Sequence, residues 1–405
     1  MTETLAIDGG TPVRDTFLPY ATQWIGPDEE ARVLQVLRSE WITTGPVTKE
    51  FEEAFARYVG AKHAVSCHSG TAALHLSMGA LGIDPGDEVI TTPFTFAATS
   101  NAVLFRGGTP VFADIQEDTR NLDPGAAAGA ITRKTKAIVP VHFGGHPCDM
   151  DELRKLAKDH SFAVVEDAAH ALSAEYRGRR IGGTDGLAVF SFHPVKNITT
   201  GEGGMVTTNS GELAERVRAL RAHGVMTDPD ARFGPRGSYF YEMRLLGHRF
   251  YMTDMQAALG IAQLGRLESF QRRRREIVAL YERELGGVEG IRLPVSRSEV
   301  LHAWHLYVIE LTGPGLDRDW AFKAMRAENI GVNVHYIPVH YHPYYRERFG
   351  DRKGRFPRAE RAYERVLTLP LFPRMTDEDA MDVVRALRKV MDVWRPRARV
   401  RHRSG

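Results

Sequence analysis

Residues 164–204 decide the fold and read VVEDAAHALSAEYRGRRIGGTDGLAVFSFHPVKNITTGEGG. Two short apolar runs, 162–165 and 187–190, lie at the start and in the middle of this stretch, and polar residues follow each run. Runs of this length are too short for helices and indicate strands buried in a parallel sheet. Since open α/β sheets bind ligands at the carboxyl ends of their strands, the polar residues after each run are candidates for a functional site.

Acidic side chains lie at the carboxyl end of one predicted strand, and an amine follows the carboxyl end of the other. Glu166 and Asp167 follow the first run, whereas Ser191 and then Lys196 follow the second. The next residues, TTGEGG at 199–204, form a glycine-rich turn that lets the backbone approach a ligand closely. A lysine in this setting is a candidate nucleophile, because burial and neighbouring charge can lower the pKa of an amine. The alternative is an ordinary surface lysine in a loop.

Short strands and helices alternate through the first half of the chain. The predicted strands are 64–66, 89–91, 111–114, 136–141 and 205–208, and the predicted helices are 72–81, 95–105, 152–160 and 212–222. This alternation predicts an α/β fold with a large, doubly wound, mostly parallel sheet. We place this domain at residues 26–265, after an N-terminal segment at 1–25.

The second half of the chain has a different order of predicted helices and strands. The irregular stretch 224–247 precedes a long helix at 253–284, which Thr253 and Gln256 would cap. Beyond it, predicted strands at 304–309 and 331–336 mix with predicted helices at 320–328 and 377–390. We therefore expect a smaller α+β domain at residues 266–394, with the boundary near Gly265, and a basic, flexible tail at 395–405.

A Ser-Gly-Thr turn separates the strand at 64–66 from the following helix. Ser69, Gly70 and Thr71 would place free backbone N–H groups and hydroxyls at the positive end of that helix, which is the arrangement that binds phosphate. The alternative is a plain helix cap. Taken alone, the turn favours the cap.

Composition and charge exclude some classes of protein. The chain has 405 residues, of which 43% are hydrophobic and 26% charged, as in ordinary soluble enzymes. Its net charge is +2, but five arginines between 395 and 403 supply five positive charges, so the rest of the chain carries −3. A mildly acidic body argues against nucleic acid as the main partner. The arginine tail could bind polyanions, although a solvated terminus is the simpler interpretation.

Cysteine content and hydropathy bear on location. Cys67 and Cys148 are the two cysteines, which gives no disulfide framework and suggests a reducing compartment. The N-terminus lacks the apolar core of a signal peptide, and no apolar run is long enough to cross a bilayer. We expect a cytoplasmic protein with no membrane partner.

Six motifs, in this order along the chain, together resemble the DegT/DnrJ/EryC1/StrS aminotransferases over about 19–387. They are SGTAALHL at 69–76, TTPFTFAATSNAV at 91–103, the stretch 164–204, GHRFYMTDMQAALG at 247–260, HAWHLYVIEL at 302–311 and VHYIPVHYHPYY at 334–345. The resemblance implies a fold type I enzyme that uses pyridoxal phosphate (PLP) to aminate keto-sugars attached to nucleotides. It also implies a homodimer with shared active sites.

The resemblance assigns roles to the residues of the central stretch. Lys196 would bind the cofactor covalently and later move the proton between cofactor and substrate. Asp167 would pair with the pyridine nitrogen and keep it protonated. His170 would lie near the phenolic oxygen of the cofactor, although a histidine in an apolar stretch is often a core residue.

The remaining cofactor contacts come from other motifs. Ser191 would hold the phosphate together with Gly70, Thr71 and Ala72, which favours the phosphate interpretation of that turn. Phe96 would stack on the cofactor ring, and Phe94 is the competing aromatic residue. Arg249, where asparagine is frequent in the family, would reach the cofactor phosphate of the partner subunit, since a guanidinium suits a phosphate.

Two histidine groups could suggest a metal. They are His142, His146 and Cys148 in the first half, and His335, His340 and His342 in the second. Both lack the paired spacing of metal ligands, so we expect no metal. The resemblance puts the second group on the sugar side, where His335 or His340 would bind the substrate by hydrogen bonds.

These inferences predict an aminotransferase that moves an amino group from glutamate or glutamine to a nucleotide-linked keto-6-deoxy sugar. Residues PYATQWIGPDEE at 19–30 and FSFHPVKNITTGEGG at 190–204 are most similar to enzymes that act at C4 of UDP-sugars. The alternatives are a C3 aminotransferase of a dTDP-keto-sugar, a cyclitol aminotransferase and a non-catalytic regulatory homologue. Lys196 argues against the related dehydratases, which carry histidine at this position.

Overall fold

The structure is a computed structural model that describes residues 3–184, 186–225 and 239–401. A seven-stranded sheet has the order β1-β9-β8-β5-β4-β2-β3. Its strands are β1 (His63–Cys67), β2 (Glu88–Thr91), β3 (Thr109–Phe112), β4 (Thr135–Val139), β5 (Ala163–Asp167), β8 (Leu187–Ser191) and β9 (Gly204–Thr208). Only β9 is antiparallel to its two neighbours within this sheet. The prediction of a mostly parallel sheet is confirmed.

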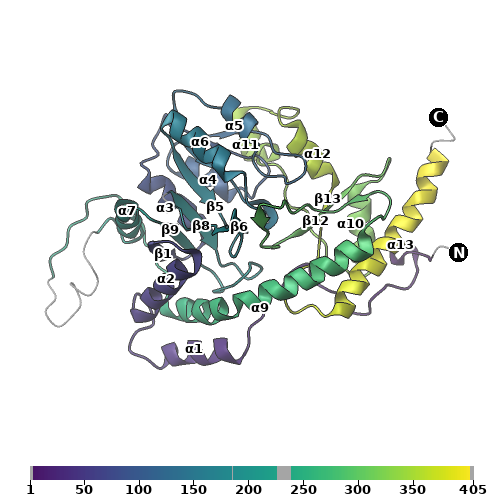
Figure 1. The fold of residues 1–405 in the computed structure, drawn as a ribbon, viewed down its shortest axis with the longest axis horizontal. Coiled ribbons are helices and arrows are strands. Elements are labelled where there is room, and N and C mark those ends of the chain that lie inside the picture. Colours follow the sequence, from purple (N-terminus) through teal and green to yellow (C-terminus); the bar gives the residue numbers. More distant parts are fainter. Residues whose placement is uncertain (1–2, 185, 226–238, 402–405) are drawn as a thin grey trace.

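Helices cover both faces of this sheet (Figure 1). They are α2 (Pro46–Val59), α3 (Gly70–Ala80), α4 (Ala98–Phe105), α5 (Pro124–Gly129), α6 (Met150–His160) and α7 (Gly211–Arg221). Consecutive residues of β2 enter opposite cores: Val89 packs with α3, α4 and α7, whereas Ile90 packs with α2, α5 and α6, and neither is exposed. Because successive strand residues point to opposite faces, burial on both faces explains the continuous apolar runs in the sequence.

One helix, α9 (Asp254–Leu285), connects the two halves of the molecule (Figure 1). It begins with the expected capping box, in which the Thr253 hydroxyl accepts the backbone N–H of Gln256 and the Gln256 side-chain oxygen accepts the backbone N–H of Thr253. Leu267 packs in the core of the large domain, whereas Ile277 packs in the second core. The predicted boundary near Gly265 therefore lies inside a continuous helix, at a change of packing partner.

The second core surrounds a three-stranded antiparallel sheet in the order β10-β12-β13. Its strands and helices are β10 (Ile291–Arg292), β12 (Tyr307–Leu311), β13 (Val366–Leu369), α10 (Arg318–Ala327), α11 (Pro343–Phe349), α12 (Pro357–Arg365) and α13 (Asp377–Arg401). Leu5 and Leu18 are buried in this core. Leu18 also exchanges backbone hydrogen bonds with Asn329 and Gly331. The start of the chain thus packs with its end rather than forming a separate segment.

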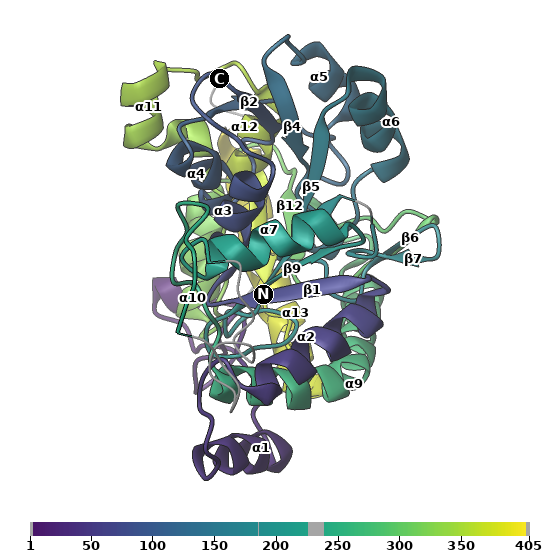
Figure 2. The ribbon, with the colours of Figure 1, turned by 90° about the vertical axis from the view of Figure 1, so that its left-hand side faces the viewer.

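Several smaller elements complete the fold. They are α1 (Pro27–Leu37), the 3-10 helices η1 (Ala6–Asp8), η2 (Phe143–Gly145) and η3 (Val339–Tyr341), and the sheet β11-β6-β7 of β6 (Glu175–Tyr176), β7 (Arg179–Arg180) and β11 (Val300–Leu301). Figure 2 shows α1 lying outside the body, next to α2 and α9. No helix in the described ranges has the length and apolarity needed to cross a membrane.

Two expectations for the second half are wrong. Residues 331–336 form no strand; within the described structure only Asn333 makes an isolated bridge, to Thr368 of β13. β13 itself was missed, because its four residues follow α12 without a turn signal. The strand predicted from 304 begins at Tyr307, since Trp304 has a left-handed backbone with φ 43°.

The predicted tail and loop are only partly described. Helix α13 continues through Arg401, so the tail expected at 395–405 is helical over its first part, and residues 402–405 lie outside the described ranges. Of the stretch 224–247, residues 226–238 also lie outside them. At its ends, Val225 bridges to Met243, and Ala222 bridges to Arg249.

Candidate active site

The carboxyl ends of β5 and β8 bring the predicted acid and amine together. The two strands are parallel neighbours, with Asp167 opposite Val189. After β8 the chain folds back on itself, because the backbone N–H of Phe192 bonds to Gly203 and that of Thr200 bonds to Phe192. Lys196 lies at the tip of this loop, close enough for its charge to affect the pKa of Asp167.

Asp167 is a buried carboxyl group with fixed partners. One carboxylate oxygen, Oδ2, accepts a 2.8 Å hydrogen bond from the Thr99 hydroxyl, and Oδ1 accepts a 3.2 Å bond from the backbone N–H of Ala169. Burial raises the pKa of Asp167, while the Thr99 and Ala169 hydrogen bonds and the Lys196 charge act in the opposite direction. These contacts hold the carboxylate in one orientation at the edge of the sheet.

Lys196 has the electrostatics of a nucleophilic amine. Burial lowers its pKa from the usual 10.5 to about 8, and the negative charge of Asp167 opposes this shift. About a tenth of the amine is therefore neutral at pH 7, and the neutral amine is the form that attacks a carbonyl. This environment excludes the alternative of an ordinary surface lysine.

The turn before α3 combines a helix cap with an anion site. Ser69 is the cap residue, and its side chain accepts the backbone N–H of Ala72 at 3.1 Å. The N–H groups of Gly70 and Thr71 lie in the first helical turn, where a helix offers no acceptor of its own. Both are available to a phosphate, whereas the N–H of Ala72 donates to the Ser69 hydroxyl of the cap, so a phosphate contact at Ala72 stays a prediction.

Ser191 lies against this turn. A Cβ atom added at Gly70 would be 3.2 Å from Oγ of Ser191 and only 2.9 Å from its Cβ, and the second distance is shorter than real Cβ contacts allow. Only glycine therefore lets the serine approach the helix terminus so closely. The hydroxyl of Ser191 and the start of α3 form a cradle suited to a phosphate.

Packing separates the two candidate aromatic residues. Phe94 is fully buried and its ring lies 5.3 Å from that of Phe143 in the core. Phe96 is 63% exposed, and its ring centroid lies 6.2 Å from that of Tyr336. Of the two, Phe96 is the ring that is accessible to a cofactor.

His170 is a buried neutral histidine whose two nitrogens both have partners. Nδ1 accepts the backbone N–H of Gly144 at 3.3 Å, and Nε2 lies 3.0 Å from the hydroxyl oxygen of Tyr336. Burial, assisted by the charge of Lys196, lowers the pKa of His170 well below its usual value. Because Nδ1 accepts, the neutral ring carries its proton on Nε2 and donates it to Tyr336.

Tyr336 is a residue that the sequence analysis missed. Burial raises the pKa of Tyr336, and the negative charge of Asp167 adds to this effect. Tyr336 therefore lies close enough to Asp167 to belong to the candidate active site. Its position in VHYIPVHYHPYY, directly after a histidine of interest, was the available signal. His305 was missed as well, although its ring lies 4.5 Å from that of His170 and the charge of Lys196 helps to lower its pKa.

The two histidines predicted to bind substrate have different surroundings. Burial, together with the charge of Lys196, lowers the pKa of His335 to about 3, and its Nδ1 lies 2.8 Å from the Thr368 hydroxyl. His340 is instead buried beside α12, where its Nε2 lies 3.2 Å from a carboxylate oxygen of Glu360. His340 thus has a structural contact, and the predicted substrate contact is retained for His335 alone.

Arg249 and the first histidine group have different surroundings, and His142 adjoins the site, since its backbone N–H donates to the carbonyl of Asp167 at 3.2 Å. Arg249 is exposed, with its guanidinium 5.7 Å from the ring centre of Tyr251. His142 accepts the backbone N–H of Cys148 at Nδ1 and contacts Glu166 at Nε2. Within the described ranges, no group of three or more His, Cys, Asp or Glu residues could hold a metal ion.

Comparison with known proteins agrees with this geometry. Residues 23–388 match the DegT/DnrJ/EryC1/StrS aminotransferase family. The chain belongs to this family. One relative in it, the spore coat polysaccharide biosynthesis protein SpsC of Bacillus subtilis (strain 168), is 46% identical over 381 residues, which cover 93% of this chain and 98% of SpsC.

Solved structures of other sugar aminotransferases in this family share the fold. The PMP form of Spr1654 from Streptococcus pneumoniae has a TM-score of 0.87 and 33% identity, covering 93% of this chain and 99% of that one. DesI, solved in the presence of its TDP-sugar product, has a TM-score of 0.87 and 34% identity, covering 98% and 99%. The chain is therefore a fold type I, PLP-dependent sugar aminotransferase, as the sequence predicted.

The residues around Lys196 fit PLP. The amine with a lowered pKa suits the aldehyde, the fixed carboxylate of Asp167 suits the ring nitrogen, and the cradle beside Ser191 suits the phosphate. When bound, the cofactor supplies an electron sink that stabilises a substrate carbanion. The surrounding protein contributes orientation, charge and the groups that move protons.

Proposed function

We propose that this aminotransferase takes its amino group from glutamate or glutamine and transfers it to a keto-6-deoxy sugar linked to a nucleotide. The observation that carries the proposal is the amine of Lys196, with its pKa of about 8, beside the buried carboxylate of Asp167. The resemblance in the motifs adds the sugar-nucleotide class, and DesI provides a relative with a TDP-sugar product.

Lys196 and Asp167 would perform the two central tasks. The neutral Nζ of Lys196 would hold the cofactor covalently, and the same nitrogen would accept and donate the proton that the transfer moves. The carboxylate of Asp167 keeps the ring nitrogen protonated, and Thr99 holds that carboxylate in place. A pKa near the working pH lets one amine both accept and donate a proton.

The other side chains position the cofactor and the sugar. Ser191, Gly70 and Thr71 hold the phosphate through a hydroxyl and two backbone N–H groups. The ring of Phe96 covers the cofactor plane, and its exposure supports this role. His170 and His335 stay neutral because of burial, so neither brings positive charge to the ligands, and His335 would bind the sugar through a hydrogen bond.

A second copy of the chain would complete the site. Large apolar side chains are exposed near Arg249, including Leu246 at 78% and Met243 at 64%, which is typical of a surface that another protein covers. An exposed arginine beside such a surface can reach the partner's phosphate cradle. We therefore propose a homodimer in which Arg249 contacts the cofactor phosphate of the partner subunit.

For the acceptor we propose C4 of a UDP-linked sugar, on the similarity of residues 19–30 and 190–204. The alternatives are C3 of a dTDP-linked sugar and a cyclitol. Because DesI was solved with its TDP-sugar product, dTDP-linked substrates should be tested in parallel. The test incubates the enzyme with UDP- and dTDP-linked 4-keto and 3-keto sugars plus glutamate or glutamine. Mass spectrometry should detect one aminated sugar, and Lys196→Ala should abolish it.

Two outcomes separate the parts of this proposal. If wild-type enzyme converts glutamate to 2-oxoglutarate in a single turnover but aminates no sugar of the panel, the sugar-nucleotide assignment fails and the amino donor stands. If Lys196→Ala retains amination, the role of Lys196 is wrong. A His335→Gln variant that loses sugar amination but keeps the glutamate turnover would support the sugar-side role of His335.

A further inference from the structure

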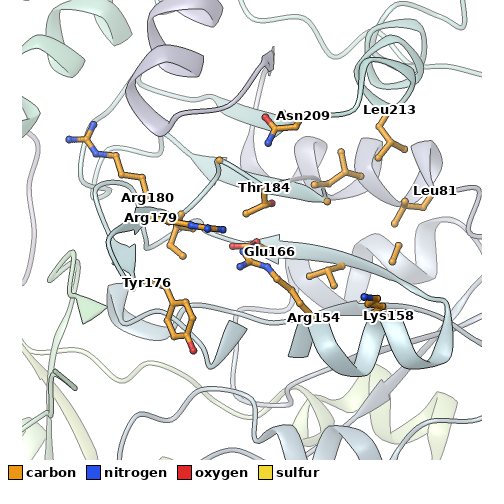
Figure 3. Close-up of a pocket in the computed structure, with 16 residues that line it drawn as sticks. Leu81, Arg154, Lys158, Glu166, Tyr176, Arg179, Arg180, Thr184, Asn209 and Leu213 are labelled. Carbon is orange, nitrogen blue, oxygen red and sulfur yellow. Dashed lines mark hydrogen bonds and ion pairs between the residues drawn. The ribbon is translucent and has the colours of Figure 1, made fainter. Parts of the chain in front are cut away.

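A cavity of about 700 Å³ opens on the side of the large sheet opposite Lys196. It is lined by the first residues of β5 and β8, by α6 and by the β6–β7 hairpin. Since Asp167 and Ser191 are the last residues of the same two strands, the cavity and the proposed active site lie at opposite edges of the sheet. Figure 3 shows the side chains that line it.

Cationic side chains dominate the polar part of this cavity. Arg154, Lys158, Arg179 and Arg180 all line it. Arg180 points away in Figure 3, and its guanidinium bonds to the Tyr58 carbonyl at 2.7 Å. The other three cations surround the same space.

Two of these cations have no side-chain partner among the residues that the structure describes. Arg154 bonds to the Glu166 carboxylate at 2.9 Å through one nitrogen. Neither Arg179 nor Lys158 has a side-chain hydrogen bond or ion pair with any residue of the described ranges. A guanidinium and an ammonium that line a cavity without a partner are available to bind an anion.

Like charges in this arrangement repel one another. Arg154 and Lys158 are four residues apart on α6, a spacing at which like charges destabilise a helix. Arg179 adds a third positive charge from the hairpin. Glu166 is the carboxylate among the lining residues, and it is already bound to Arg154 and His142. Among the described lining residues, cations therefore outnumber the one carboxylate, and an anion would neutralise the excess positive charge.

Apolar side chains also line the cavity, together with the polar residues Thr184 and Asn209. The apolar lining residues include Leu81, Val164, Leu187 and Leu213, and the ring of Tyr176 also lines the cavity. Small-molecule sites commonly measure about 300–1,000 Å³ and combine an apolar lining with a few polar groups that fix the ligand. The volume and the mixed lining of this cavity match that description.

We propose that this cavity binds a small molecule that carries phosphate groups, and that Arg179, Lys158 and the free nitrogens of Arg154 hold them. A guanidinium binds phosphate through two parallel hydrogen bonds, and the ammonium adds a point charge. Three cations suit phosphate groups better than a single carboxylate, because each phosphate monoester carries about −1.5 to −2 charges near neutral pH. This site is separate from the aminotransferase site and does not depend on the proposed substrates.

Isothermal titration calorimetry of the full-length enzyme loaded with PLP tests the proposal. Pyrophosphate and ADP are the two probes, since they share the phosphate chemistry and differ in the apolar part. We expect about one site per chain, and a dissociation constant that Arg179→Ala and Lys158→Ala each raise by roughly tenfold, the effect of losing one charge-assisted hydrogen bond. The matched control is Lys155→Ala, which removes the same charge from α6 outside the cavity and should change the constant less than about twofold.

Each outcome has a clear meaning. Tighter binding of ADP than of pyrophosphate supports a nucleotide that also uses the apolar lining, and equal binding supports a free polyphosphate. The proposal is overturned if neither probe binds, or if binding is the same in Arg179→Ala, Lys158→Ala and wild type. Retention of the cofactor absorbance and of the thermal melting temperature in each variant verifies that the protein is folded.

Discussion

The hydroxyl of Tyr336 lies 3.0 Å from Nε2 of His170, although 166 residues separate them in the chain. Their rings are also nearly parallel, with an interplanar angle of 20° and centroids 6.0 Å apart. Because His170 donates its only proton to the tyrosine oxygen, the Tyr336 proton is directed elsewhere. This pair links the large sheet to the segment after α10 at the proposed cofactor site.

Replacing Tyr336 by phenylalanine should slow the enzyme without unfolding it. The change leaves the N–H of a buried histidine without its acceptor, so we expect kcat to fall by roughly five- to tenfold while PLP still binds. Steady-state kinetics and the visible absorbance of the cofactor measure the two effects. Tyr344→Phe is the control, since Tyr344 is exposed and bonds to Arg348 outside the site. Equal rates for wild type and Tyr336→Phe would remove Tyr336 from the proposed site.

The amine of Lys196 should react at lower pH than other lysines. Burial lowers its pKa to about 8, so its reductive methylation by formaldehyde in the apoenzyme should rise with pH and reach half its maximum near pH 8. Lys155 is an internal control with the opposite shift, because its hydrogen bond to Asp159 raises its pKa above 10.5. Peptide mass spectrometry reports both residues in one sample.

A variant tests the electrostatic cause of this shift. Asp167 raises the pKa of Lys196 by its negative charge, so Asp167→Asn should move the labelling midpoint of Lys196 to lower pH. The Lys155 midpoint should not change. A Lys196 midpoint above pH 10 in the wild type, or one that moves upward in Asp167→Asn, would contradict the described environment.

Thr99→Val should lower kcat, because it removes the hydrogen bond that fixes the Asp167 carboxylate toward the cofactor nitrogen. The variant removes the 2.8 Å hydrogen bond to Oδ2 while nearly preserving the volume of the side chain. A hydrogen bond to a charged group contributes more than one between neutral groups, so we expect kcat to fall by about tenfold or more. Thr91→Val is the control, since its hydroxyl bonds to the Val139 carbonyl within the sheet. Unchanged kcat in Thr99→Val would show that Asp167 needs no such support.

Gly70→Ala should weaken PLP binding. The new Cβ would lie 2.9 Å from that of Ser191, so the serine or the helix terminus must shift and the phosphate cradle must change shape. We expect the dissociation constant of PLP to rise by roughly tenfold, in line with the cost of overpacking. Gly129→Ala is a matched control, because a Cβ there meets no atom within 4 Å. PLP affinity that is equal in the two variants would exclude the cradle.

Much of the fold could be predicted because its signals are local. The run at 187–190 is buried on both faces of the sheet, and the run at 162–165 is buried or half-buried, so both are apolar without interruption. The cap of α9 could also be predicted, since Thr253 and Gln256 are three positions apart in the sequence and bond to each other. β13 escaped prediction because its strand character depends on pairing with β12, about 60 residues earlier.

Sequence by itself determined the chemistry of the site: the lysine and the aspartate that follow two buried strands, the glycine-serine turn before α3, and the family to which they belong. Tertiary structure decided which of two residues of the same type lies at the site. Phe94 and Phe96 are two positions apart, yet packing buries one ring and leaves the other accessible. His335 lies near Lys196, whereas His340 pairs with Glu360. Such choices depend on contacts between distant segments, which composition and spacing do not encode.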